Sequence, residues 1–332
     1  MTTLQDELQR IGNLIENYLE THLARRNPTR LWDAARHLPR AGGKKLRPFL
    51  TINTCRALGG SEEDALPPAA AIELIQTFSL VHDDIIDRDQ TRRGVPTVHK
   101  KWGIPTAIVA GDLLHIKAYE VLTTAAMKNQ KLLRALPAIL NEINNSTVSI
   151  CEGQELDEEL ERKAKPTEDE YLDMISRKTA SLFEAATVTG ALAAEQSTDT
   201  VKLVRRFGHQ LGMSFQIIDD ILGLTADEKE LGKPVGSDIR EGKRTLLVIY
   251  ALANGSSKEK KAILRALGNR KASVNQYSNA AKAIVSSGAL DYSRRKAEEY
   301  AQQARSALLS LPESDERRLL DEALQFVLKR SY

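Results

Sequence analysis

The chain has 332 residues, a net charge of +2 and 42% hydrophobic residues. This length allows a large core, and the near-neutral charge argues against a nucleic-acid-binding surface, because such surfaces are usually strongly basic. No apolar run reaches the roughly 18 residues of a membrane span, and Cys55 and Cys151 are too few for a disulfide framework. With no secretion or lipidation pattern at either end, we expect a soluble cytoplasmic protein.

The first third of the chain is predicted to be helical. Apolar residues recur at helical spacing from Leu4 to Leu19, and Pro28 ends this segment. Residues 1–27 are the one part that we expect to be peripheral and able to swing free. A loop with Pro39 and two glycines follows. Ser61, with acidic residues after it, is typical of a capped helix start.

The rest of the chain is also predicted to be helical, and no strand is expected. A loop is expected around Pro96, and Pro105 suits the first turn of the next helix. Further helices are expected at 140–163, 167–194 and 199–222, followed by an extended polar stretch at 225–242 and then by shorter helices. No segment has the composition of a domain linker, so we expect residues 1–332 to form one all-α helical bundle.

Three aspartates, Asp83, Asp84 and Asp87, end the long apolar helix that begins near Ser61. Asp83 and Asp87 lie about 40° apart on the helix, and close carboxylates repel one another by roughly a few kcal/mol per pair. A hard divalent cation relieves this repulsion, and a ligand set made only of carboxylates favours Mg²⁺ over zinc. The alternative is a helix that merely ends in acidic residues.

A second acidic pair, Asp219 and Asp220, ends another apolar helix. Two such helices that face each other across a bundle would place their carboxylates around one cavity and one metal site. Basic residues near the expected helix ends would suit a phosphate or diphosphate bridged by the metal. Singly, each basic residue is alternatively a solvated surface charge. The glycine-rich pieces lack P-loop spacing, and there is no Cys/His zinc pattern.

Taken together, motifs in this order resemble the trans-isoprenyl diphosphate synthases, and among them the geranylgeranyl diphosphate synthases most. The motifs are Gly42–Pro48, Asp83–Asp87 with Arg92–Gly94, Gly153-Gln154 with Asp157, Lys178-Thr179, Phe215-Gln216 with Asp219-Asp220, Gly232-Lys233 and Gly242–Thr245. The resemblance spans about residues 40 to 250. It implies an all-α fold with a deep apolar cavity and a homodimer. Gly223 departs from it, because the second motif often has a third aspartate there.

The resemblance also implies a role for each motif residue. Asp83, Asp84 and Asp87 would hold Mg²⁺ against an allylic diphosphate, and Asp219, beside Asp220, would take a third ion. Arg92, Lys178 and Lys233 would bind that diphosphate, and Lys243 belongs to the same substrate-binding set. Lys44, Arg47 and Arg93, with Gln76, would bind isopentenyl diphosphate. Thr179 and Gln216 would line the region of the developing carbocation.

The implied reaction is head-to-tail condensation of isopentenyl diphosphate with a dimethylallyl, geranyl or farnesyl diphosphate. Phe78 and Ser79, five and four positions before Asp83, are typical of enzymes that make a C20 product, and ordinary packing between helices is the alternative role for Phe78. Alternatives for the whole chain are a farnesyl (C15) or bifunctional C15/C20 synthase, a class I terpene cyclase, a non-catalytic synthase subunit and a structural helical dimer.

Overall fold

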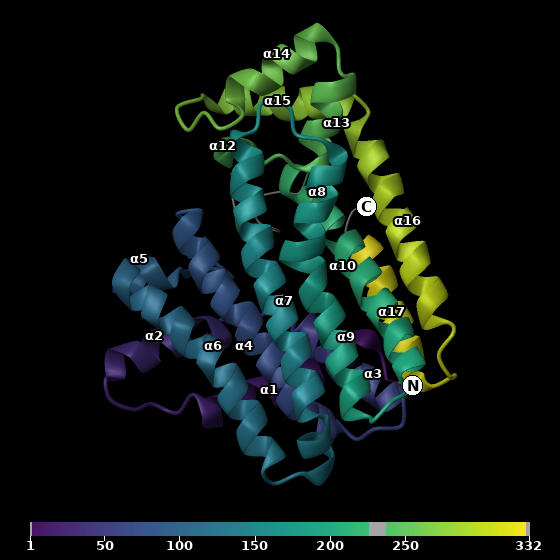
Figure 1. Ribbon diagram of the computed structural model, residues 1–332. Coiled ribbons are helices and arrows are strands. Elements are labelled where there is room, and N and C mark those ends of the chain that lie inside the picture. Colours follow the sequence, from purple (N-terminus) through teal and green to yellow (C-terminus); the bar gives the residue numbers. More distant parts are fainter. Residues whose placement is uncertain (1, 226–236, 330–332) are drawn as a thin grey trace. The chain divides into compact units, whose positions relative to one another are not determined.

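A computed structural model describes residues 2–225 and 237–329 of the chain. Within them, helices make up the regular structure apart from one short hairpin, which confirms the predicted all-α fold class (Figure 1). None of the described helices is both long enough and apolar enough to cross a bilayer. Lys233 lies outside the described residues.

Contacts between residues divide the chain into two compact units. Unit 1 comprises residues 1–147, 182–208 and 306–323, and unit 2 comprises the remaining residues. Helices α7 (Gln130–Arg162), α10 (Thr198–Thr225), α16 (Ala289–Leu308) and α17 (Asp315–Lys329) contribute residues to both units. The other elements of unit 1 are α1 (Leu4–His22), α2 (Thr29–Arg40), α3 (Leu46–Ala57), α4 (Glu62–Ile86), β1 (Thr91–Arg92), β2 (Val95–Pro96), α5 (Val98–Trp102), α6 (Ile104–Ala126) and most of α9 (Ser181–Ala193).

Helix α4 lies in the core of unit 1 and packs against α3 and α6 (Figure 1). The Ser61 side chain caps its first turn by accepting a hydrogen bond from the amide of Asp64, as the sequence predicts. Most residues from Ala65 to Phe78 are buried, because the helix is apolar around much of its circumference. The acidic motif therefore lies at the C-terminal end of a well-packed helix.

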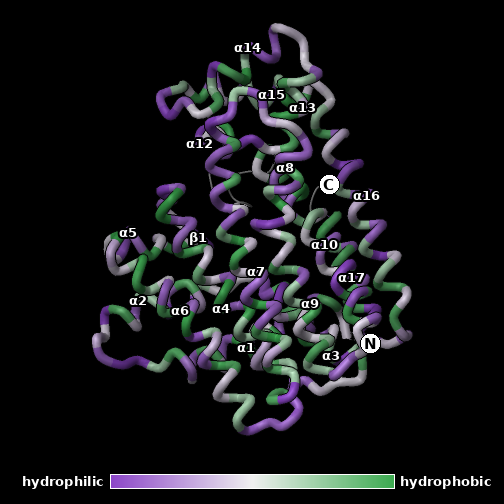
Figure 2. Tube along the Cα trace, viewed as in Figure 1, coloured by the Kyte–Doolittle hydropathy of each residue, from purple (hydrophilic) through white to green (hydrophobic). Residues whose placement is uncertain are grey.

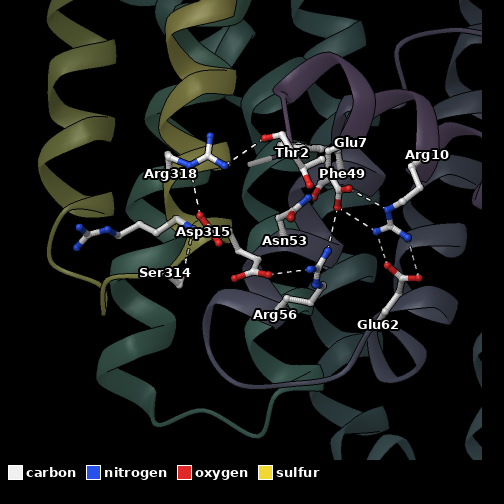
Figure 3. A network of polar contacts seen from close by, with 12 residues as sticks. Thr2, Glu7, Arg10, Phe49, Asn53, Arg56, Glu62, Ser314, Asp315 and Arg318 are labelled. Atoms are coloured by element: carbon white, nitrogen blue, oxygen red, sulfur yellow. Dashed lines mark hydrogen bonds and ion pairs between the residues drawn. The ribbon is translucent and has the colours of Figure 1, made fainter.

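Helix α1 is docked on this core, so the expectation that residues 1–27 can swing free is wrong for this helix. Ile11, Ile15 and Leu19 are buried, and α1 packs against α3 and α4. At its polar edge, the Glu7 carboxylate accepts hydrogen bonds from Arg10 Nε at 2.8 Å and Arg56 Nη1 at 2.9 Å (Figure 3). Charge pairing and apolar burial thus hold the same helix.

Three local differences from the expected elements stand out. Helix α2 occupies residues where we expected a loop, and it continues through Pro39 because Trp32 and Leu38 are buried on its inner side. Helix α7 begins at Gln130, ten residues before the expected start at 140. Strands β1 and β2 pair in antiparallel fashion in the expected loop around Pro96.

Unit 2 contains α8 (Glu168–Ile175), a π-helical turn η1 (Ser176–Ala180), α12 (Ser237–Glu241), α13 (Leu246–Asn254), α14 (Ser257–Ala266) and α15 (Val274–Ser286). A capping box between Thr167 and Glu170 opens α8, and the helix runs through η1 into α9, as the sequence predicts. Hydrophilic and hydrophobic residues alternate along α16 (Figure 2). Ala297, Ala301 and Ala304 are among the buried residues of α16, at helical spacing.

Docking of α1 predicts a stability effect. Replacing Ile15 by alanine leaves a cavity in a fully buried site, and we expect the free energy of unfolding to fall by about 2–5 kcal/mol. Urea denaturation followed by circular dichroism measures this. Asn13→Ala, at an exposed position of the same helix, is the matched control and should change little. Equal stability of Ile15→Ala and Asn13→Ala would show that α1 is not part of the core.

Candidate active site

The first acidic motif occupies the last turn of α4. Asp83 and Asp84 lie within the helix and Asp87 is its C-cap, with its amide donating to the carbonyl oxygen of Asp83 at 2.9 Å. Asp84 is buried, whereas Asp83 and Asp87 are half-buried. Negative charges at a helix C-terminus interact unfavourably with the helix dipole. The motif therefore needs a positive partner.

Arg92 is a partner that the structure shows. The hairpin of β1 and β2 turns the chain back, and Arg92 Nε donates to Asp84 Oδ1 at 2.5 Å. Arg92 Nη2 lies 3.3 Å from Asp89 Oδ2 and 3.8 Å from Asp83 Oδ2. One guanidinium thus faces three carboxylates, whereas the expected role of Arg92 in binding a diphosphate stays a prediction.

Asp84 remains under electrostatic stress. Burial raises its pKa to about 6, and the charges of Asp89 and Asp83 add to this effect while Arg92 opposes it. Its Oδ2 atom is buried and accepts no hydrogen bond from the described residues. The oxygen-only donor set fits a hard cation such as Mg²⁺. In the described part of the chain, however, no three Asp, Glu, His or Cys side chains are already gathered around a metal position.

A basic region of unit 1 contains Lys44, Arg47 and Arg93. Arg93 Nη1 donates to the carbonyl oxygens of Leu38 at 3.2 Å and Gly42 at 2.5 Å. Gly43 has φ +122°, and a Cβ there would lie 2.8 Å from Arg93 Cζ, so glycine is required. The structure therefore brings Arg93 against the loop that carries Lys44.

The neighbouring basic residues differ in their surroundings. The Arg47 guanidinium lies 4.3 Å from the centre of the Phe183 ring, a cation–π contact. Lys44 is exposed. Lys45 is buried and its Nζ pairs with Glu73 Oε1 at 2.9 Å, which gives Lys45 a structural place. Gln76 is half-buried on α4. It lies on the same face of the helix as Asp83, which follows seven positions later.

The predicted chain-length residues, Phe78 and Ser79, belong to α4, and Phe78 contacts α6. The Phe78 ring stacks on His115 of α6 with centroids 4.9 Å apart and meets His82 edge-on at 5.2 Å. Ser79 is half-buried, and its hydroxyl donates to the carbonyl oxygen of Gln76. Phe78 therefore packs between helices, and its role in setting product length stays a prediction.

The second acidic motif, in unit 2, has two unlike aspartates. Asp219 is exposed, whereas Asp220 is buried. Asp220 Oδ2 accepts from Tyr171 Oη and Asp220 Oδ1 from Gln216 Nε2, both at 2.7 Å. Thr179 Oγ1 in turn donates to Gln216 Oε1 at 2.7 Å. Asp220 therefore orients Gln216, and Asp219 is the carboxylate that a ligand can reach.

Burial also shifts the titration of this pair. The pKa of Asp220 is raised well above its ordinary value, first by burial and then by the charge of Asp238, although Tyr171 and Gln216 oppose the shift. Tyr171 is fully buried, and its pKa is likewise raised by burial and by Asp220. Sequence reasoning gave Tyr171 no role, because its partner lies 49 positions away.

Two predicted lysines of unit 2 share one carboxylate. Lys178 Nζ lies 2.6 Å and Lys243 Nζ 3.0 Å from Asp157 Oδ2. Burial alone would raise the pKa of Asp157, but the two ammonium groups lower it below its ordinary value. No role for Asp157 follows from its sequence motif, and the structure shows that its carboxylate holds both lysines.

The backbone around Lys178 is unusually close to α7. A Cβ on Gly153 would lie 2.3 Å from the Lys178 amide nitrogen, so only glycine allows this approach. Lys178 itself is in the π-helical turn η1, a feature frequent at functional sites. The Gly153 motif therefore sets the position of Lys178.

Comparisons with known proteins identify the family of this chain. The model of the polyprenyl synthetase family matches residues 28–284. A geranylgeranyl diphosphate synthase from Sulfolobus acidocaldarius is 46% identical over 313 residues, covering 93% of this chain and 92% of that protein. A geranylfarnesyl diphosphate synthase from Aeropyrum pernix is 40% identical over 324 residues, covering 96% of this chain and 99% of that protein.

A solved structure adds a fold comparison. The crystal structure of a polyprenyl synthase from Caulobacter crescentus, complexed with calcium and isoprenyl diphosphate, superposes with a TM-score of 0.89 at 33% identity and covers 98% of both chains. The order of the motifs, the all-α fold and these matches together show that the chain belongs to the polyprenyl synthetase family and is a prenyltransferase.

Proposed function

We propose that this protein condenses isopentenyl diphosphate head-to-tail with an allylic diphosphate, in a Mg²⁺-dependent reaction that gives mainly the C20 product, geranylgeranyl diphosphate. The observation that carries the proposal is the set of carboxylates at the end of α4 with Arg92 among them. Three ions are expected from the family resemblance, with Asp83, Asp84, Asp87 and Asp219 as their ligands.

The residues present fit this metal. Their donors are carboxylate oxygens, and the buried Asp84 Oδ2 accepts no hydrogen bond from the described chain. Mg²⁺ bound there would neutralise the charge that develops on the leaving diphosphate. The Caulobacter crescentus relative was solved with calcium and isoprenyl diphosphate, which supports a role for a divalent ion.

The chain's own cations have separate tasks in this reaction. Arg92, Lys178 and Lys233 would bind the allylic diphosphate and stabilise the negative charge that grows as the C–O bond breaks, and Lys243 would serve in substrate binding. Lys44, Arg47 and Arg93 hold the diphosphate of isopentenyl diphosphate, with help from Gln76. Arg93 is suited to this because the Gly42–Gly43 loop fixes its direction.

The bond-forming step needs a dry, polarised surrounding. The double bond of isopentenyl diphosphate attacks the allylic cation, and the proton then lost passes to the released diphosphate. Thr179 and Gln216 are fixed in a hydrogen-bonded chain that ends at Asp220, and they would line the region where the positive charge develops. Ile217 and Ile218 are buried beside the acidic pair and exclude water that would quench the cation.

The alternatives differ in how well they agree with these observations. A cyclase needs no second diphosphate site, whereas Arg93 lies against the Gly42–Gly43 loop that precedes Lys44 here. A non-catalytic subunit would be expected to lose an acidic motif, and this chain keeps both. C15 and bifunctional C15/C20 synthases stay as alternatives within the same chemistry, and the relatives named for geranylgeranyl and geranylfarnesyl products favour elongation to C20 or beyond.

We also propose a cytoplasmic homodimer. Helix α6 exposes Ile104, Ile108 and Ile116, which fall within an arc of about 120° on the helix. Exposed apolar stripes of this kind mark association surfaces. The two cysteines are free thiols, which suits a reducing compartment.

The reaction is tested by incubating the protein with Mg²⁺, labelled isopentenyl diphosphate and each allylic starter, followed by dephosphorylation and chromatography. A labelled linear C20 alcohol supports the proposal. A cyclic hydrocarbon, or no incorporation with any starter, contradicts it.

In the same assay, Asp84→Asn should lower kcat by about 10²–10³-fold, because it removes charge that acts on the leaving group. Asp199→Asn is the matched control, since the Asp199 side chain is 91% exposed, and it should retain full activity. Full activity of Asp84→Asn would show that the α4 motif does not serve the reaction.

Phe78→Ala should lengthen the product beyond C20, because it removes the ring that stacks on His115. Reversed-phase chromatography of the dephosphorylated products measures the chain length. Ile72→Ala, at another buried position of α4 about 120° around the helix, controls for loosened packing. If Phe78→Ala gives an unchanged C20 distribution, Phe78 is only a packing residue.

A further inference from the structure

The second acidic motif lacks its usual third carboxylate, because position 223 is glycine. Residue 223 lies one turn after Asp219 and about 40° around the helix from it. An aspartate there would place its carboxylate next to that of Asp219. The surroundings of Gly223 show what takes that place.

A carboxylate from another helix fills the position. A Cβ on Gly223 would lie 2.6 Å from Asp238 Oδ2 and 3.4 Å from Asp238 Cγ. Carbon and oxygen atoms do not approach to 2.6 Å without a bond. The Asp238 carboxylate therefore occupies the volume that a side chain at position 223 would need, and glycine is what admits it.

The backbone fixes Asp238 in this place. Its carbonyl oxygen accepts hydrogen bonds from the amides of Gly242 at 3.0 Å and Lys243 at 2.9 Å. Gly242 has φ +93°, a conformation that favours glycine. The next residue of α12, Ile239, is buried. The same turn thus holds both Asp238 and Lys243, which pairs with Asp157.

The charge at this end of α10 is consistent with such a role. Both oxygens of Asp220 already accept hydrogen bonds, from Tyr171 and Gln216. Asp220, Gly223 and Asp238 line the same small cavity. Asp238 is therefore close enough to act electrostatically as a member of the motif.

We infer that Asp238 supplies, from α12, the third carboxylate of the second acidic motif, in the place that Gly223 leaves open. This inference rests on the proposed function, since it gives Asp238 a positioning role in binding Mg²⁺ and diphosphate. Helix α10 and helix α12 together then make one acidic group of Asp219, Asp220 and Asp238.

The first test measures binding without turnover. Isothermal titration of the full chain with inorganic pyrophosphate in Mg²⁺ should show that Asp238→Asn weakens affinity by about 10–100-fold, the range seen when a supporting partner of a metal ligand is removed. Asp291→Asn, whose side chain is 74% exposed, is the matched control and should bind as the wild type does. Equal affinity of Asp238→Asn and wild type overturns the inference.

The second test exchanges the two positions. Gly223→Asp alone should lower both Tm and Mg²⁺-dependent pyrophosphate affinity, because its side chain meets Asp238 Oδ2. Adding Asp238→Ala should restore both, since one carboxylate then occupies the site from α10. If the double variant is no better than Gly223→Asp, or if Gly223→Asp is as stable as wild type, the inference fails.

The outcome also separates this inference from the proposed function. Wild-type protein that shows neither Mg²⁺-dependent pyrophosphate binding nor transfer to isopentenyl diphosphate removes the proposed function, and the inference with it. Wild-type protein that does both, alongside an Asp238→Asn variant of equal affinity, removes the inference alone.

Discussion

The contact between Arg92 and the carboxylates at the end of α4 is the interaction on which unit 1 of this molecule depends. Buried acids at a helix C-terminus are unfavourable by themselves, and Asp84 keeps a pKa of about 6 even with the guanidinium at 2.5 Å. The short hairpin that delivers Arg92 also delivers Arg93 to the Gly42–Gly43 loop. One turn of chain thus prepares both of the diphosphate sites proposed for this unit.

Unit 2 contains the reverse arrangement of charges, in which one carboxylate pairs with two basic side chains. The buried Asp157 carboxylate holds the ammonium groups of Lys178 and Lys243. These two positive charges are therefore positioned before an anion binds. Hydrogen bonds from Tyr171 and Gln216 hold Asp220 in place. Preorganised charges of this kind need no rearrangement of the protein as charge develops on a substrate, which is the usual source of electrostatic catalysis.

The sequence predicts those parts of this picture that depend on local chemistry. Aspartates at the ends of apolar helices and caps such as Ser61 and Thr167 lie where their neighbours in sequence place them. Helix α2 was not predicted, because a proline such as Pro39 usually ends a helix. In the structure, burial of Trp32 and Leu38 stabilises the helix through this position. The roles of Tyr171, Asp157 and Asp238 depend on partners distant in sequence, and periodicity carries no information about such pairs. Asp157 was nevertheless open to inference, since it lies one helical turn after Gly153.

The proposed function requires both acidic motifs to act on one diphosphate. A double-mutant cycle of Asp83→Asn and Asp219→Asn, read out as the Mg²⁺-dependent binding free energy of inorganic pyrophosphate, tests it most directly. If both carboxylates serve one ligand, the double variant should lose less than the sum of the single losses, with a coupling energy of about 0.5–3 kcal/mol. Losses that add within about 0.3–0.5 kcal/mol would show two independent sites and contradict the account.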